Sequence, residues 1–188
     1  MQKAHEIIIA GFGGQGVLSM GQIIAYAAIK EGKEVSWMPS YGPEMRGGTA
    51  NCIVIVAESR ISSPIVSTFD SAILLNQPSV DKFAALVRPA GVILFESSTV
   101  ITAPSRHDVE IAGIGANEEA LRLASRQVSN MVMLGAFLSF RPIVAPENVL
   151  KALKEVLPER HHHLLPLNEK ALEKGKALAM EMSARKVS

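Results

Sequence analysis

The strongest constraint on the fold is a short apolar run that leads directly into a glycine-rich turn near the amino terminus. Residues 7–10 are Ile-Ile-Ile-Ala, a continuous apolar run typical of a strand buried on both faces. Residues 11–16 read Gly-Phe-Gly-Gly-Gln-Gly and match the pattern G-x-G-x-x-G. Over residues 17–31 apolar side chains recur at helical spacing, and Gly32 is placed to end that helix in a left-handed conformation. This order of strand, turn and helix predicts the opening of an α/β domain.

The rest of the chain continues the alternation of strand-like and helix-like segments. Further strands are expected at 35–38, 51–56, 71–76, 92–96 and 108–114, and helices at 80–87, 130–140, from Pro146 onward and at 168–182. The connection before the third strand is short for a packed crossover helix, so an antiparallel third strand is expected, and Asn117 is the expected cap of a later helix. Residues 1–188 therefore predict one Rossmann-like α/β domain, with a mostly parallel or mixed sheet, helices on both faces and the carboxyl-terminal helices appended.

Charge and composition exclude several classes of partner. The chain carries 19 Lys+Arg and 18 Asp+Glu, a net charge of +1, so it has no broad basic field for nucleic acid or for an anionic membrane. No segment has the form of a signal peptide or membrane span, and a cytoplasmic protein is expected. Only 20% of the residues are charged and the mean hydropathy is +0.22, which indicates that part of the surface meets another protein.

The single cysteine, Cys52, limits the redox chemistry that this chain can perform alone. One thiol cannot build a disulfide, a zinc site or the cradle of an iron–sulfur cluster, so a cluster would have to lie on another chain. Cys52 falls in an alternating strand pattern and is expected to be a small buried hydrophobe. The three histidines at 161–163 are consecutive and do not converge on one ion, so a solvated loop is expected there. The sequence therefore predicts no catalytic residue and no metal ligand.

The first candidate site is the glycine turn itself, formed by Gly11, Gly13, Gly14, Gln15 and Gly16. Its backbone amides and the positive end of the following helix could hold an anion. An NAD site would also need an acidic residue at the end of the second strand, where this chain has Met-Pro-Ser at 38–40. Two interpretations remain open: the turn binds another anion, or its glycines permit close packing of a helix or a partner. In both interpretations the Gln15 side chain would lie beside what the turn contacts, whether an anion or a packed helix or partner.

The second candidate site is the loop at 39–52, which carries Tyr41, Glu44, Arg46, Gly47 and Asn51. Loops hold functional groups disproportionately often, and the Arg46 guanidinium could grip a carboxylate or phosphate with two hydrogen bonds. The alternative is an internal ion pair between Glu44 and Arg46. Either way, the loop is expected beside the glycine turn at the carboxyl ends of neighbouring strands, the usual ligand edge of an open sheet.

These two motifs belong to a wider pattern that resembles a known family. Together with Asn-Gln-Pro at 76–78, Asn-Met at 130–131 and Leu-Gly-Ala at 134–136, they resemble the gamma subunits of 2-oxoacid:ferredoxin oxidoreductases and the corresponding domain of single-chain pyruvate enzymes. The resemblance covers nearly the whole chain. The long form of the segment at 41–52 resembles the branch acting on 2-oxoglutarate or branched-chain 2-oxoacids more than the pyruvate branch.

The resemblance implies a cytoplasmic complex that decarboxylates a 2-oxoacid, 2-oxoglutarate above all, with coenzyme A (CoA) and passes the electrons to ferredoxin. Thiamine diphosphate, Mg2+, 4Fe-4S clusters and CoA would then lie on, or be shared with, alpha, beta and in some complexes delta subunits, and none is expected on the isolated chain. This chain would contribute to assembly and to the wall of the substrate or CoA channel, and would be inactive alone. The alternatives are a stand-alone nucleotide- or CoA-binding Rossmann-like protein, a small dehydrogenase, and a gamma-like subunit of a pyruvate or indolepyruvate oxidoreductase.

Overall fold

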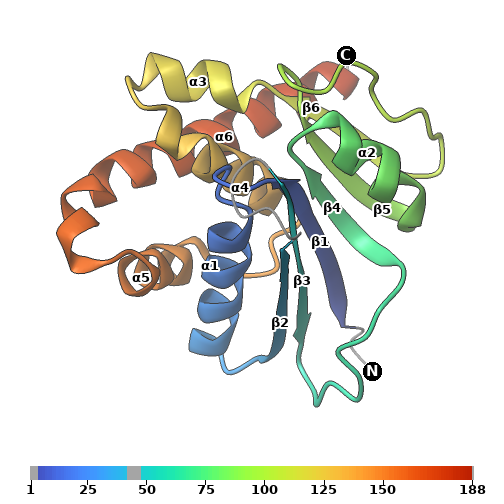
Figure 1. Cartoon of the computed structure of the whole chain (residues 1–188), viewed down its shortest axis with the longest axis horizontal. Helices are drawn as coiled ribbons and strands as arrows, with labels where there is room; N and C mark the ends of the chain where they lie inside the picture. Colours follow the sequence, from blue (N-terminus) through green and yellow to red (C-terminus); the bar gives the residue numbers. More distant parts are fainter. Residues whose placement is uncertain (1–3, 42–47, 188) are drawn as a thin grey trace.

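The computed structural model describes residues 4–41 and 48–187 of the chain. In chain order the strands and helices are β1 (His5–Phe12), α1 (Val17–Lys30), β2 (Glu34–Tyr41), β3 (Thr49–Ala57), β4 (Phe69–Leu74), α2 (Gln77–Phe83), β5 (Val87–Glu96), β6 (Glu110–Ile114), α3 (Ala116–Arg122), α4 (Ser129–Phe140), α5 (Pro146–Val156) and α6 (Leu165–Val187). Short 3-10 helices lie at η1 (Ala84–Leu86), η2 (Arg126–Val128) and η3 (Glu159–Leu164). Figure 1 shows these elements arranged around one sheet.

Within the described residues, the six strands form a mixed sheet in the order β2-β3-β1-β4-β5-β6 (Figure 1). The pairs β1–β4, β4–β5 and β5–β6 are parallel, whereas β3 runs antiparallel to both its neighbours, β1 and β2. The predicted interior position of the first strand and the predicted antiparallel third strand are both confirmed. β2 and β3 are consecutive in the chain and lie side by side as an antiparallel pair at one edge of the sheet.

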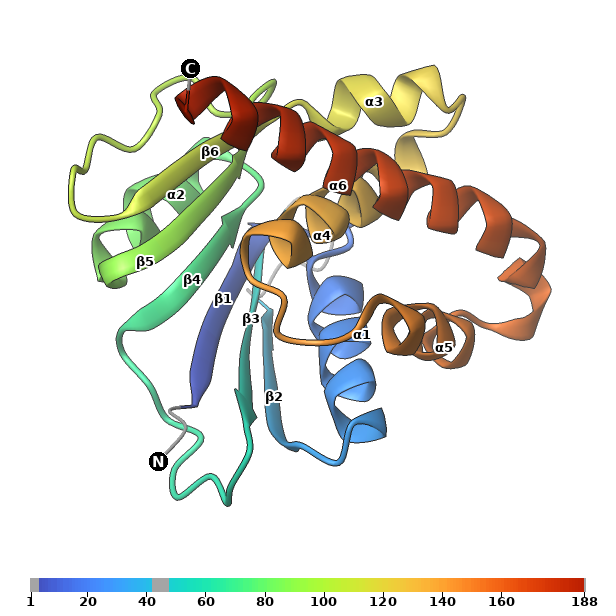
Figure 2. The same cartoon turned by 180° about the vertical axis from the view of Figure 1, so that it is seen from behind.

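Helices cover both faces of the sheet, as the sequence predicts. α1, α4, α5 and α6 lie on one face and α2 lies on the other (Figures 1 and 2). α1 ends as expected, because Gly32 adopts a left-handed φ of 74° just beyond it. The carboxyl ends of β1 and β4 and the amino ends of α1 and α2 therefore meet at one edge of the sheet, which is where α/β domains usually bind ligands.

Two helix starts differ from the sequence-based prediction. α2 begins at Gln77 instead of residue 80, because the Asn76 side chain accepts a hydrogen bond from the Ser79 N–H at 2.9 Å and caps the helix. Asn117 is not a cap: Gly115 precedes α3 at that position, and the Asn117 N–H donates to the Glu96 carboxylate at 3.1 Å. In both cases a side-chain contact at the edge of the sheet fixes where the helix starts.

The strand after α2 is longer than predicted. β5 begins at Val87, so Arg88 lies in the strand and does not close the preceding helix. The Arg88 guanidinium donates to the Asp70 carboxylate at 2.9 Å and to the Thr68 carbonyl at 2.8 Å. These bonds tie the start of β5 to the segment that enters β4, which local sequence preference does not reveal.

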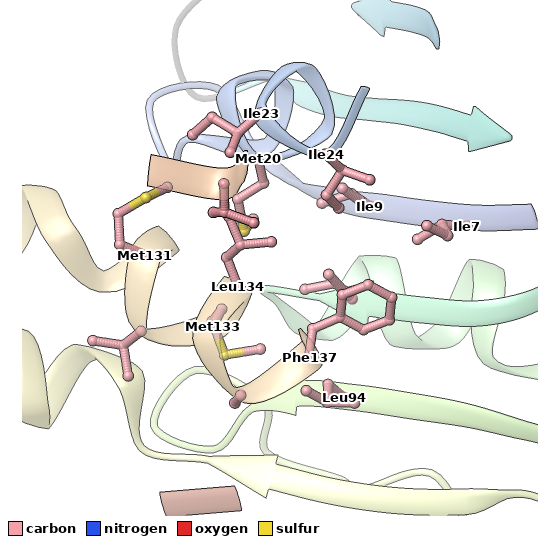
Figure 3. Close-up of a cluster of buried hydrophobic side chains, with 14 of the residues drawn as sticks. Ile7, Ile9, Met20, Ile23, Ile24, Leu94, Met131, Met133, Leu134 and Phe137 are labelled. Carbon is pink, nitrogen blue, oxygen red and sulfur yellow. The ribbon is translucent and has the colours of Figure 1, made fainter. Parts of the chain in front are cut away.

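The nearly all-apolar helix α4 lies at the centre of the main core. Figure 3 shows Leu134 and Phe137 of α4 lying between α1 and the strands β1 and β5. Both side chains are fully buried, as are Ile9 of β1 and Leu94 of β5. Burying such side chains contributes about 1.5–3 kcal/mol each. α4 is therefore integral to the domain, and the carboxyl-terminal helices expected as appended are α5, which packs on α1, and α6, which packs over α4.

Two glycines let α4 and α6 cross at backbone contact. A Cβ atom at Gly135 would lie 2.0 Å from the Leu172 carbonyl oxygen, and one at Gly175 would lie 1.9 Å from the Val132 carbonyl oxygen. Only glycine fits at these two positions, so the sequence sets the distance between the two helices. No helix in the described ranges is long and apolar enough to cross a membrane.

Candidate functional site

The two sequence motifs meet at the carboxyl end of β1. The turn at residues 13–16 joins β1 to α1, and the Gly13 N–H donates to the Gly48 carbonyl at 2.9 Å. Strand register continues this contact, because Phe12 faces Thr49 and Ala10 faces Asn51 across the β1–β3 pair. The glycine turn and the end of the second motif thus form one continuous surface at the ligand edge of the sheet.

Glycine is required in the turn by the backbone conformation. Gly14 has a φ of 93° and Gly16, which caps α1, has a φ of 76°. These left-handed values cost other residues energy because the Cβ atom approaches the following carbonyl. Glycine at positions 14 and 16 therefore lets the chain form this turn without backbone strain.

Several backbone donors of the turn have no partner within residues 4–41 and 48–187. The Gly13 N–H is used by Gly48 and the Gln15 N–H by Phe12, and the helical ladder begins with Met20 donating to Gly16. Among the described residues no partner is found for the N–H groups of Gly14, Gly16, Val17, Leu18 and Ser19. The first turn of α1 contains no acidic side chain, so the positive end of the helix dipole is not neutralised there. Free amides at the start of a long helix form a site suited to a phosphate or carboxylate.

A small cavity opens on these donors. It has a volume of about 220 Å³ and is lined by Phe12, Gly13, Gly14, Gly16, Val17, Leu18, Ser19 and Ala50. All five residues with free N–H groups are among its walls, and the Ser19 hydroxyl adds one more possible donor. The described residues of this arrangement supply hydrogen-bond donors suited to an anion.

The side chain of Gln15 is engaged within the fold. Its Oε1 atom accepts from the Phe12 N–H at 2.6 Å, and its Nε2 atom donates to the Leu75 carbonyl at 3.3 Å. The sequence predicted that the Gln15 side chain would lie beside a ligand. In the structure its carboxamide hydrogen-bonds the backbone of Phe12 and Leu75. Direct contact between Gln15 and a ligand stays a prediction.

Asn130 is a neighbour of the turn that sequence reasoning did not assign to the site. It lies in the first turn of α4, and a Cβ at Gly16 would lie 2.3 Å from its Nδ2 atom. Its Oδ1 atom is buried and has no hydrogen-bond partner among the described residues. The one signal in the sequence was a carboxamide at the start of an otherwise apolar helix, which does not reveal the contact.

The second motif is only partly described. Asn51 lies in β3 and is half-buried, opposite Ala10, and Tyr41 ends β2 opposite Ala50. Glu44, Arg46 and Gly47 lie outside the described residues. The predicted roles of these three residues, and the alternative ion pair between Glu44 and Arg46, therefore stay predictions.

The thiol of Cys52 is buried beneath α1 and is unreactive as a nucleophile. Burial raises the pKa of Cys52 to about 12, and its Sγ atom donates to the Val17 carbonyl at 3.5 Å. In the described part of the chain no three His, Cys, Asp or Glu side chains gather as metal ligands. The histidines at 161–163 lie in η3. One cysteine in the whole chain does not fit the four thiolates that an iron–sulfur cluster needs.

A charged network at the opposite, amino-terminal edge of the sheet resembles a catalytic cluster but is structural. The His5 Nε2 atom lies 2.8 Å from the Ser71 hydroxyl, and Asp70 accepts from the Glu6 N–H at 2.9 Å. Ser71 is fully buried, so a substrate cannot reach its hydroxyl. Burial lowers the pKa of His5; for Asp70, burial raises the pKa, but the hydrogen bonds from Glu6 and Arg88 outweigh it and the pKa is lowered. The network fixes the starts of three strands.

Comparison with known proteins shows the family to which the chain belongs. The family model of pyruvate ferredoxin/flavodoxin oxidoreductase matches residues 6–178. The chain therefore belongs to the pyruvate ferredoxin/flavodoxin oxidoreductase family, and the resemblance that the motifs indicate is confirmed.

Two curated relatives show how the family arranges this domain. Ketoisovalerate oxidoreductase subunit VorA of Methanothermobacter thermautotrophicus is 40% identical over 176 residues, which cover 94% of this chain but only 36% of VorA. The 2-oxoglutarate synthase subunit KorC of Methanocaldococcus jannaschii is 32% identical over 189 residues, covering 97% of each chain. The chain thus spans about a third of the first relative and nearly all of the second.

Two solved structures share the fold. The gamma subunit of a keto/oxoacid ferredoxin oxidoreductase from Geobacter sulfurreducens superposes with a TM-score of 0.80 at 31% identity, covering 94% of this chain and 99% of that one. A 2-oxoglutarate:ferredoxin oxidoreductase from Magnetococcus marinus, solved with 2-oxoglutarate, coenzyme A and succinyl-CoA bound, gives a TM-score of 0.87 at 25% identity. That match covers 96% of this chain and 32% of the other.

Proposed function

We propose that this chain is the gamma subunit of a 2-oxoacid:ferredoxin oxidoreductase. The observation that carries the proposal is the end-to-end correspondence with separate subunits, 97% of both chains for KorC and 94% and 99% for the Geobacter gamma subunit. The reaction would convert a 2-oxoacid, CoA and two oxidised ferredoxins to acyl-CoA, carbon dioxide, two reduced ferredoxins and a proton. The complex would be cytoplasmic, with alpha and beta chains, and in some complexes a delta chain, as partners.

The contribution of this chain to that reaction would be to bind and orient CoA or the 2-oxoacid. The free N–H groups of residues 14 and 16–19 suit the phosphates of CoA, the cofactor bound in the Magnetococcus structure. Arg46 would add a guanidinium from the neighbouring loop. Thiamine diphosphate, Mg2+ and the 4Fe-4S clusters would lie on the partner chains and supply the decarboxylation and electron transfer. No catalytic residue is proposed on this chain.

The 2-oxoacid is proposed to be 2-oxoglutarate, with 2-oxoisovalerate as the alternative. KorC, a 2-oxoglutarate synthase subunit, matches over 97% of both chains, whereas the ketoisovalerate subunit VorA has the higher identity of 40% but is covered over only 36% of its own length. The two acids differ at the far end, a carboxylate in one and a branched apolar group in the other. A pyruvate or indolepyruvate enzyme is the remaining possibility within the family.

The test is reconstitution of the complex. Co-expressed alpha, beta and gamma chains, supplied with thiamine diphosphate and Mg2+, should form acyl-CoA and reduce ferredoxin with 2-oxoglutarate, and more slowly or not at all with 2-oxoisovalerate, pyruvate and indolepyruvate. Omitting the gamma chain is the control and should abolish or strongly reduce activity. If the isolated chain binds CoA or a nucleotide tightly and the complex is equally active without it, the stand-alone binding protein is the correct function.

A further inference from the structure

The Gln15 side chain connects the glycine turn to the centre of the sheet. Its two hydrogen bonds reach the Phe12 N–H at 2.6 Å and the Leu75 carbonyl at 3.3 Å. Leu75 follows β4 directly, and its own N–H donates to the Ala10 carbonyl at 2.9 Å. The carboxamide therefore joins the turn to a point that is itself held by the pairing of β1 with β4.

The space that Gln15 occupies depends on a missing side chain. A Cβ at Gly11 would lie 2.6 Å from the Gln15 Oε1 atom and 3.0 Å from the Leu75 Cβ atom. Gly11 has an ordinary strand conformation within β1, so its lack of a side chain serves to make this room. Gly11, which leaves the space, and Gln15, whose side chain fills it, both belong to the motif at residues 11–16.

The anchor at Leu75 is fixed from a second side. Its carbonyl also accepts from the Thr99 hydroxyl at 2.8 Å, which uses the second lone pair of the oxygen. The Thr99 hydroxyl lies 3.1 Å from the buried Glu96 carboxylate, which in turn accepts from the Asn117 N–H at 3.1 Å. Close polar contacts, in which the single Thr99 hydrogen is shared between Leu75 and Glu96, thus run along the carboxyl edge of the sheet from the glycine turn to the start of α3.

We propose that Gln15 is a positioning residue: it holds the glycine turn in the conformation that leaves the amides of residues 14 and 16–19 free for an anionic ligand, and it does not contact that ligand. The inference rests on the proposed function of the turn. Glycine-rich segments sample many conformations, and a ligand that must order one binds more weakly. A carboxamide has one acceptor and one donor group, and this attachment uses both.

Two variants at one position separate the two hydrogen bonds. Gln15→Met keeps the length of the side chain and removes both bonds, whereas Gln15→Glu keeps the acceptor for Phe12 and loses the donor for Leu75. Gln22→Met is the matched control, because Gln22 is a half-buried residue of α1 with no hydrogen bond from its side chain to the described residues. All three are made in the reconstituted complex of alpha, beta and gamma chains.

The assay combines steady-state kinetics with hydrogen exchange. Gln15→Met should raise the KM for CoA about tenfold and leave kcat and the KM for the 2-oxoacid within about twofold. Exchange of the Phe12 amide, measured by mass spectrometry with residue-level fragmentation, should become faster in Gln15→Met but stay slow in Gln15→Glu. Gln22→Met should match the parent in every measurement.

The possible failures point to different errors. Faster exchange at Phe12 with an unchanged KM for CoA would overturn the positioning role and leave the proposed function intact. A raised KM without faster exchange would mean that Gln15 touches the ligand directly, which also overturns the proposal. A parent complex that forms no acyl-CoA from any of the four 2-oxoacids would overturn the proposed function, and the positioning role with it.

Discussion

Alanine at Gly16 should cost far more stability than alanine at Gly14, although both glycines belong to one turn. Both residues have a left-handed φ, 76° and 93°, so both variants carry the same kind of backbone strain. The surroundings differ. A Cβ at Gly14 meets nothing within 4 Å, whereas one at Gly16 would lie 2.3, 2.7 and 2.9 Å from the Nδ2, Cγ and Cβ atoms of Asn130.

The structure gives a magnitude for each change. Backbone strain alone predicts a loss of about 1–2 kcal/mol in unfolding free energy for Gly14→Ala. Gly16→Ala adds the overpacking against Asn130, about 1–3 kcal/mol more. Asn130→Ala alone should cost less than about 1 kcal/mol, because the Oδ1 atom that it removes has no partner among the described residues. In the double variant, Asn130→Ala should recover at least about 1 kcal/mol of the Gly16→Ala loss.

Urea unfolding of the four variants and the parent measures these losses of unfolding free energy. The signal is the fluorescence of Trp37, the single tryptophan. Gly14→Ala serves as the matched control for strain without overpacking. Equal losses for Gly14→Ala and Gly16→Ala, or strict additivity of Gly16→Ala and Asn130→Ala, would show that Asn130 does not pack against the turn. The close contact between the glycine turn and the first turn of α4 would then be wrong.

Three further predictions test other parts of the molecule. In the reconstituted complex, Arg46→Ala should raise the KM for CoA or for the 2-oxoacid roughly tenfold to a hundredfold; weakened assembly with both constants unchanged would make the loop an interface instead. Gly135→Ala should lower the unfolding free energy by about 3 kcal/mol or more, because its Cβ would meet the Leu172 backbone at 2.0 Å, and a urea midpoint equal to that of the parent would refute the close crossing. Because burial lowers the pKa of His5 in the folded state, the unfolded chain binds the proton first as the pH falls below about 6.5. Stability should therefore be fully present above that pH and decline below it, and His5→Gln should flatten the stability profile between pH 7 and 5.

Local patterns in the sequence were enough to predict the opening of the fold. The apolar run in β1, the glycine turn and the helix that Gly32 ends are each specified by neighbouring residues, so periodicity and turn chemistry reveal them. The antiparallel direction of β3 followed from the length of one connection. These signals act over a few residues, which is the range that a single sequence reports.

Contacts between distant residues could not be predicted in this way. Gln15 binds the carbonyl of Leu75, sixty positions away, and the Asn117 N–H meets the Glu96 carboxylate across the sheet edge. A nearly all-apolar helix such as α4 shows no preferred face, so its sequence does not reveal whether it fills the core or covers it. The two candidate motifs could be placed at one edge, but the side chains that hold them there could not be identified.

The described cavity is small, so under the proposed function this chain would hold only part of a ligand. Sites that enclose a whole small molecule usually measure about 300–1,000 Å³, whereas the cavity at the glycine turn measures about 220 Å³. The described residues that line it supply neutral donors and no cation, so these residues alone would leave much of a phosphate's charge uncompensated. Both facts require a second surface, from the loop that carries Arg46 or from a partner chain, to enclose CoA. The family contains this domain both as a separate subunit and as a third of a longer chain, and a site completed across a domain boundary functions in either arrangement. The isolated chain should accordingly bind CoA at least tenfold more weakly than the assembled complex does, and equal affinities in calorimetry would show that the described cavity is sufficient.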